Sequence, residues 1–168
     1  MVEPWLRSSR NEIEPIRRAV LHALDLAEED LYRWSKDLSR EELHARPHNL
    51  PSVAFQLRHI ARSLDRLLTY AEGGSLTEMQ LVLLRSEADA QGTPEEVLAE
   101  LGGALATSRD RILAMTSGFG ELRHVGRDRL PVTLGGLLVH VADHTQRHVG
   151  QAITTSKVVA ALRLGKTL

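Results

Sequence analysis

The sequence predicts an all-α protein, in which four long amphipathic helices form a four-helix bundle and one short extra helix lies in the crossover. Apolar residues recur at spacings of three and four over long stretches, which is the period of a helix packed on one face. Alternating β-branched runs are missing, and aromatic residues are only 4% of the chain. The length of 168 residues fits a single domain over positions 1–168.

Two long helices are predicted in the first half of the chain. The first runs from about Ser9 to Asp37, with Pro15 near its start, where a proline costs least. The second runs from about 51 to 71, after a loop that contains Pro47, and Gly73-Gly74 end it. The apolar stripes that define them are Ile13, Ile16, Val20, Leu21, Leu24, Leu31 and Trp34 in the first helix, and Val53, Leu57, Ile60, Leu64, Leu67 and Leu68 in the second.

The middle of the chain predicts the short crossover helix, over about 75–90, and then a third long helix, over about 93–115. A polar loop is expected after it, opened by Gly118 and Gly120. Both helix starts match the capping-box pattern, in which a hydroxyl residue precedes Glu by three positions. The residues that give these signals are Ser75 with Glu78, and Thr93 with Pro94 and Glu96.

Composition and charge exclude several classes of protein. The 21 basic and 22 acidic residues give a net charge of −1, so we expect neither a nucleic-acid nor a membrane partner. The pattern of apolar residues predicts neither a signal peptide nor a membrane span, which favours a cytoplasmic location. The chain has no cysteine, so disulfides, thiolate ligands and a cysteine nucleophile are excluded.

The last long helix, predicted from about 131 or 133 to 163, carries a run of histidines. His140, His144 and His148 follow one another at i, i+4 and i+8, which places neighbouring members on one helix face. Two imidazoles at this spacing can bind one ion through bonds of about 2.0–2.1 Å. The full run drifts along the helix axis, so one ion does not easily take all three. The spacing leaves two chelating pairs open, His140/His144 and His144/His148.

A third ligand must come from another helix, and His59 is the best candidate. It lies in the middle of the second predicted helix, flanked by the core residues Leu57, Ile60 and Leu64. A charged imidazolium there is costly, whereas a neutral ring bound to a metal is satisfied. A lone helical histidine is more often a surface or hydrogen-bonded core residue, so a purely structural bundle stays an alternative.

A competing metal pattern is present. The segments 41–44 and 121–124 both read Glu-x-x-His, the spacing found in di-iron carboxylate bundles. Both fall at predicted helix ends or in loops, whereas that site needs ligands that project from helices into a bundle. We therefore interpret the other histidines as solvated or loop residues, namely His22, His44, His48 and His124.

Two segments together resemble the DinB/YfiT-like superfamily of metalloenzymes: 52–61, which reads SVAFQLRHIA, and 144–151, which reads HTQRHVGQ. The similarity in the order and spacing of helices extends from about Glu12 to Arg163. Two positions depart from the family pattern: Phe55 stands where tryptophan is common, and Val149 stands where arginine is common.

This resemblance implies an up-down-down-up bundle, a homodimer and one divalent metal ion. It carries His59, His144 and His148 over as the metal ligands and leaves His140 outside them. Zinc and nickel are the ions of known members, and iron or manganese also suits imidazole ligands.

Three histidine ligands leave a coordination position open, which is typical of a catalytic rather than a structural zinc site. Some relatives are thiol-dependent transferases or isomerases. The resemblance therefore implies a metal-dependent S-transferase, isomerase or hydrolase that acts on a small-molecule substrate such as a low-molecular-weight thiol. The alternative is a non-catalytic metal-binding protein of the stress response. Helical proximity marks further supporting or substrate-contacting candidates: His140, Asp143, Gln151, Ser63 and Arg62.

Overall fold

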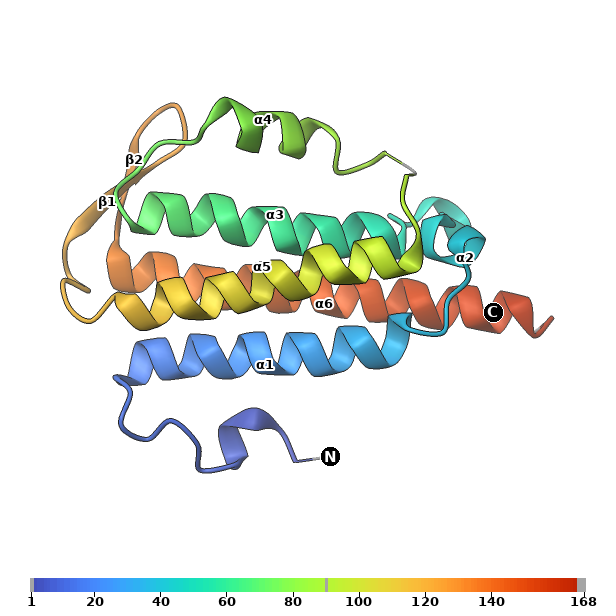
Figure 1. Ribbon diagram of the computed structural model, residues 1–168, viewed down its shortest axis with the longest axis horizontal. Coiled ribbons are helices and arrows are strands. Elements are labelled where there is room, and N and C mark those ends of the chain that lie inside the picture. Colours follow the sequence, from blue (N-terminus) through green and yellow to red (C-terminus); the bar gives the residue numbers. More distant parts are fainter. Residues whose placement is uncertain (1, 90, 166–168) are drawn as a thin grey trace.

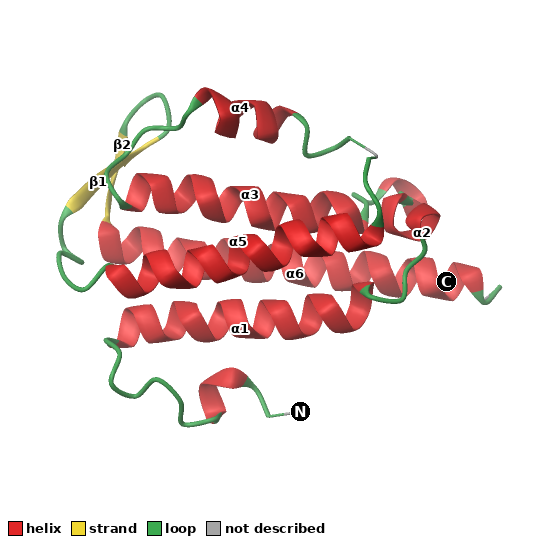
Figure 2. Ribbon diagram, viewed as in Figure 1, coloured by secondary structure: helices red, strands yellow, loops and turns green. Residues whose placement is uncertain are grey.

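The computed structural model describes residues 2–89 and 91–165. These residues are mostly helical, as predicted, and a small two-stranded sheet is added to the helices (Figure 2). The extent of the single domain over 1–168 stays a prediction, since both of its ends lie outside the described residues. The elements are η1 (Pro4–Leu6), α1 (Pro15–Ser35), α2 (Arg40–His44), η2 (Pro47–Asn49), α3 (Val53–Ala71), α4 (Glu78–Arg85), α5 (Pro94–Ala114), β1 (Leu122–Val125), β2 (Leu130–Thr133) and α6 (Leu134–Arg163).

Helices α1, α3, α5 and α6 lie side by side, with α1 and α6 running in one direction and α3 and α5 in the other (Figure 1). Both α1 and α3 pack against α5 and α6. Their shared core consists mainly of leucines, and each fully buried side chain contributes about 1.5–3 kcal/mol. Fully buried members include Leu21, Leu24, Leu31, Leu57, Ile60, Leu64, Leu68, Leu105, Ile112 and Leu138. No helix within the described residues is long and apolar enough to cross a membrane.

The first helix is shorter than expected. It begins at Pro15, which lies in the first turn. The Glu14 side chain caps the helix by accepting a hydrogen bond from the Arg17 amide. The preceding residues cannot continue the helix, because Ser8 and Arg10 both have positive φ. Trp34 was expected in the core stripe but is 36% exposed.

The crossover also differs from the prediction. Helix α4 is capped by Thr77, paired with Gln80 in a capping box, rather than by Ser75 with Glu78. It ends at Arg85, and the expected end at Ala90 lies outside the described residues. The helix lies along the outer side of α3, and the chain then turns into α5 (Figure 1). The capping box predicted for α5 is present, with Thr93 accepting from the Glu96 amide.

The loop expected between the last two long helices contains a β-hairpin, which corrects the all-α prediction. Strands β1 and β2 pair antiparallel, with Leu122 opposite Thr133 and Val125 opposite Leu130. Strands of four residues are too short to show a period of two in the sequence. The hairpin packs at the end of the helices where α3 stops and α6 begins. The Arg123 guanidinium holds it there by donating a hydrogen bond to the carbonyl of Ala71 at 2.7 Å.

Candidate metal centre

Three histidines meet where α3 packs against α6. His59 comes from the middle of α3, and His144 and His148 come from successive turns of α6. Their ring centroids lie 4.3–5.0 Å apart: 5.0 Å for His59 and His144, 4.3 Å for His59 and His148, and 4.6 Å for His144 and His148. One ring nitrogen of each lies within 4.8 Å of the others, so the three could hold a metal ion together.

The Nδ1 atom of each ring faces away from the group and has its own partner. His59 Nδ1 donates to Glu87 Oε2 at 2.7 Å, and His148 Nδ1 donates to Gln56 Oε1 at 2.7 Å. His144 Nδ1 lies 3.5 Å from the Ser63 hydroxyl, which itself donates to the carbonyl of Ile60. A carboxylate and an amide oxygen only accept, so the ring proton of His59 and His148 resides on Nδ1.

This arrangement leaves lone pairs on the Nε2 atoms that face one another. Nε2 of His59 and Nε2 of His144 are 3.3 Å apart. Two nitrogens that bind one zinc ion at about 2.0–2.1 Å and at a tetrahedral angle are about 3.3–3.4 Å apart. Two facing acceptors without a proton between them are poorly satisfied, and a shared cation resolves this. The donor type of the three rings and the spacing of His59 and His144 therefore fit a divalent ion.

Burial keeps two of the rings neutral. Burial, followed by the charges that His148 and His59 would carry, lowers the pKa of His144 to about 4. Burial and the neighbouring His59 also lower the pKa of His148, while a hydrogen bond with the Gln151 side chain acts in the opposite direction. At neutral pH both rings are therefore unprotonated at the nitrogen that a metal requires.

Glu87 is the buried anion of the site. It lies just after α4, on the connection to α5, and its side chain is only 5% exposed. Arg66 donates to its other oxygen at 2.6 Å. Burial alone would raise the pKa of Glu87, but the hydrogen bonds from His59 and Arg66 outweigh it and hold that pKa below its ordinary value. The carboxylate is therefore ionised and orients the His59 ring.

The histidine group is reachable from solvent. The His59 side chain is 18% exposed, and the ring of Phe55 stacks on it with centroids 5.6 Å apart and planes 16° apart. A hollow of about 430 Å³ is lined by Gln56, which contacts His148, but by none of the three histidines, and a smaller hollow of about 150 Å³ is lined by Phe55. The larger hollow is lined by Leu50, Pro51, Gln56, Arg147, Gly150, Gln151, Thr154 and Thr155.

The other sequence candidates take different positions. The His140 ring is 5.5 Å from that of His144, one turn earlier on α6, and is not part of the three-histidine group. Asp143 is exposed and pairs with Arg147 at 2.9 Å. Gln151 interacts with His148, and Ser63 with His144, as described above. Arg62 instead reaches Glu100, the carbonyl of Leu83 and the hydroxyl of Ser86, which ties α3 to α4 and α5.

The two Glu-x-x-His segments do not form a second site. The first lies in α2 and the second runs from the residue before β1 into that strand, and these elements are at opposite ends of the molecule (Figure 1). The His44 ring bonds to the carbonyl oxygen of Gly92 at 3.1 Å. The interpretation of these histidines as solvated or loop residues is wrong for two of them. His44 is half-buried in α2. His22 is 8% exposed and lies 3.4 Å from the Ser9 hydroxyl, because the segment before α1 folds over it.

For two residues of the site, no pattern in the sequence identified their role. Gln56 lies within the segment that resembles the known family, yet its role depends on the 2.7 Å contact to His148. Glu87 lies 28 positions after His59 and comes near it only because the crossover folds back over α3.

The fold and the site together define a helical protein with a three-histidine group suited to a metal ion. The model of the DinB superfamily matches residues 23–152, which is most of the chain. The chain therefore belongs to the DinB superfamily.

A solved structure shows the same fold. It is described as a conserved protein of locus from Enterococcus faecalis, and it aligns with a TM-score of 0.61 at 22% sequence identity. The alignment covers 84% of this chain and 95% of that one. Among curated proteins, none matches the sequence.

Proposed function

We propose that this chain is a cytoplasmic metalloenzyme, in which an up-down-down-up bundle of α1, α3, α5 and α6 holds one zinc or nickel ion. His59, His144 and His148 would be its ligands. The observation that carries the proposal is the convergence of one ring nitrogen from each histidine within 4.8 Å, while the Nδ1 atoms of His59 and His148 are bonded to partners outside the group. A hydrogen-bonded core histidine has no need of this arrangement, since its two nitrogens would each find a protein partner.

The chemistry follows from what the site leaves open. When bound, a divalent ion with three imidazole ligands supplies Lewis-acid activation of a water or a thiol. We infer a small-thiol-dependent S-transferase, with isomerase or hydrolase chemistry as related reactions of the same site. The hollow of about 430 Å³ that Gln56 lines behind His148 is within the range of small-molecule sites, about 300–1,000 Å³.

The surrounding residues preorganise this site. Glu87 and Gln56 fix two ring orientations from behind, so the donor atoms do not have to reorganise when an ion binds. The Phe55 ring covers one face of His59 and limits the approach of water from that side. Arg147 and Gln151 line the larger hollow and offer a cation and an amide to a polar substrate.

Metal content tests the first half of the proposal. Protein purified without an affinity tag or chelator should contain about one divalent ion per chain by elemental analysis. His144→Ala should abolish this content. His140→Ala is the matched control, because it removes an imidazole one turn away on the same helix and should leave the content unchanged. Substoichiometric metal in the parent protein, with no change in uptake or thermal stability in His144→Ala, would refute the site.

A turnover screen tests the second half. We expect activity when small thiols are combined with electrophilic substrates, and loss of that activity in His59→Ala with the helical circular dichroism intact. Turnover that survives this change contradicts the mechanism. Stoichiometric metal without turnover of any thiol pair favours the alternative, a non-catalytic metal-binding protein of the stress response.

We also propose that the protein is a homodimer, as the family resemblance implies. Sedimentation equilibrium measures this directly, with a monomer mass of 18.7 kDa as the reference. A single species at the monomer mass over the micromolar range would contradict the proposal.

A further inference from the structure

A third hollow lies at the end of the molecule where the β-hairpin meets the α3–α4 connection. It has a volume of about 500 Å³, which is within the size range of small-molecule sites, about 300–1,000 Å³. Tyr70 near the end of α3 is eleven residues after His59, so the hollow is roughly 16 Å along the helix from the histidine group. The two sites are therefore separate.

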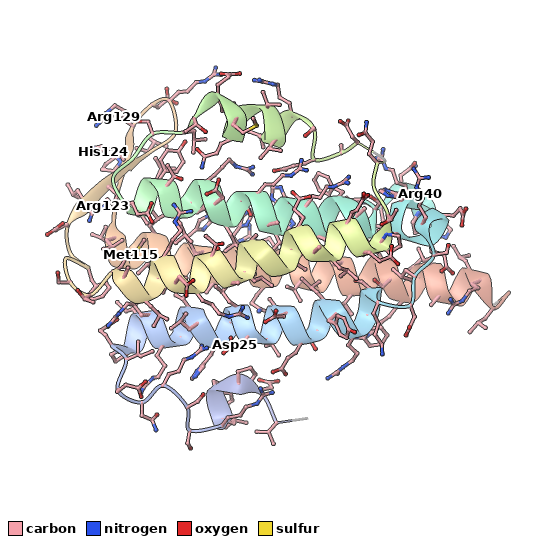
Figure 3. All side chains as sticks on the ribbon, in the orientation of Figure 1. Asp25, Arg40, Met115, Arg123, His124 and Arg129 are labelled. Atoms are coloured by element: carbon pink, nitrogen blue, oxygen red, sulfur yellow. The ribbon has the colours of Figure 1, made fainter. Side chains whose placement is uncertain are left out.

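The lining of this hollow is strongly basic. It contains three arginines and a histidine, and none of its described lining residues is acidic. The lining residues are Tyr70, Gly73, Gly74, Ser75, Leu76, Leu81, Leu122, Arg123, His124, Gly126, Arg127 and Arg129. Figure 3 shows Arg123, His124 and Arg129 along the hairpin, on the side of the molecule where α4 begins. The net charge of the whole chain is −1, so this concentration of positive charge is local.

The three arginines have different roles. Arg123 is already used, because its guanidinium donates to the carbonyl of Ala71 and to Glu121, and so fixes the hairpin to the end of α3. Arg127 and Arg129 form no ion pair within residues 2–89 and 91–165. Arg129 is held in the left-handed region at φ 50°, with its amide bonded to the carbonyl of Gly126 across the hairpin loop. Two free guanidinium groups are thus placed at one rim of the hollow.

The opposite wall is main chain. Gly73, at φ 82°, and Gly74 connect α3 to the segment before α4, and their amides already donate to the carbonyls of Tyr70 and Thr69. Ser75 adds an exposed hydroxyl to the same wall. The donors that phosphate oxygens require are therefore the guanidinium groups of Arg127 and Arg129 and the Ser75 hydroxyl. The apolar side chains of Leu76, Leu81 and Leu122, together with Tyr70, can cover the organic part of a ligand.

We propose that this basic hollow binds a phosphate-bearing small molecule, with Arg127 and Arg129 as its charged ligands. The site is independent of the metal proposed for the histidine group, since it shares no residue with that group. Carboxylates are the other source of a multiply charged oxyanion, and the test separates them from phosphates.

Inorganic pyrophosphate is the probe for this site. Titration of the full-length protein in about 150 mM salt, followed by ¹H–¹⁵N NMR, should shift the amides of Gly73, Gly74 and Gly126 and leave the surroundings of His59 unchanged. Location is part of the readout, because pyrophosphate also chelates metals and would reveal binding at the histidine group by shifts there. Citrate, a carboxylate of similar charge, is titrated in parallel to compare its affinity with that of pyrophosphate.

Charge-removing variants complete the experiment. Arg127→Gln with Arg129→Asn should weaken pyrophosphate binding by about tenfold or more, since two charge-assisted contacts are lost. Asparagine is chosen at 129 because it tolerates positive φ. Arg40→Gln is the matched control: it removes an exposed arginine at the opposite end of the molecule and should leave the affinity within about twofold (Figure 3). No shift at the three glycines, equal weakening by Arg40→Gln, or tighter binding of citrate would overturn the proposal.

Discussion

Within the histidine group, the acceptors behind the rings differ in charge. Glu87 and Gln56 both accept from Nδ1 at 2.7 Å, so both fix a ring and its proton. Glu87 is also an anion, and a negative charge behind an imidazole increases the basicity of its other nitrogen. His59 should therefore be the strongest of the three donors, with Glu87 acting on a bound ion through it.

Glu87→Gln removes the charge and keeps an acceptor of the same size. We expect the affinity for zinc to fall by about 10- to 100-fold, because His59 becomes a weaker donor while the ring stays in place. Competition with a chromophoric chelator measures the change. Glu78→Gln, on exposed α4, is the control and should have no effect. Equal affinity in the parent protein and Glu87→Gln would mean that Glu87 has no part in the site.

The three histidines could be identified from the sequence, but the residues that support their rings could not. The i, i+4 spacing of His144 and His148 follows from helix geometry, so it is visible in the sequence. The spacing alone allowed the pair His140/His144 equally, and only the resemblance to the DinB family favoured His144/His148. Contacts between elements, such as that of Glu87 with His59, depend on how the crossover folds and have no local pattern.

Among the elements, the crossover that carries Glu87 is held down by a buried arginine. Arg58 is 8% exposed, and its guanidinium donates to the carbonyls of Asp89 at 2.8 Å and Gln91 at 2.5 Å. These two acceptors lie on the segment between α4 and α5. Arg58 is the residue next to His59 on α3, so the same helix turn supplies both a proposed metal ligand and the arginine that holds the segment near Glu87.

Arg58→Met retains most of the apolar stem and removes the donors. Two carbonyls then lose their partner, and we expect a loss of about 1–3 kcal/mol in the free energy of unfolding. Amide hydrogen exchange at Glu87 and Asp89 should become faster, and zinc should bind more weakly, because Glu87 is no longer held behind His59. Arg85→Met is the control, since Arg85 is exposed on α4. Unchanged exchange at these amides would show that the crossover does not depend on Arg58.

The long helices could be predicted because each buries a stripe that repeats over several turns. The short elements could not. Helix α2 has five residues and owes its start to Ser39 paired with Glu42, a signal too common to be specific on its own. The hairpin is fixed by tertiary contacts such as Arg123 with Ala71, which lie 52 positions apart.

For the molecule as a whole, the metal site proposed at the histidine group would link metal binding to folding. Its ligands come from α3 and α6, which are distant in sequence, so the complete site exists only when these helices pack together. An ion that binds only the folded chain stabilises it in proportion to the logarithm of its concentration over Kd. Stability should therefore depend on metal concentration and, through the ligand protons, on pH.

The metal-free protein should lose stability in mild acid. The pKa of His144 is about 4 in the fold, because of burial and the nearby His148, His59, His140 and Arg147, whereas its ordinary value is 6.5. Between these values the unfolded chain binds a proton that the folded chain does not. The contribution of His144 to the free energy of unfolding is therefore at its full value above about pH 6.5 and is lost as the pH drops toward about 4. Urea unfolding in the presence of chelator should show this fall, and His144→Gln should make it shallower, while His140→Gln should not. A pH dependence identical in the parent and His144→Gln proteins would show that His144 is not the group responsible.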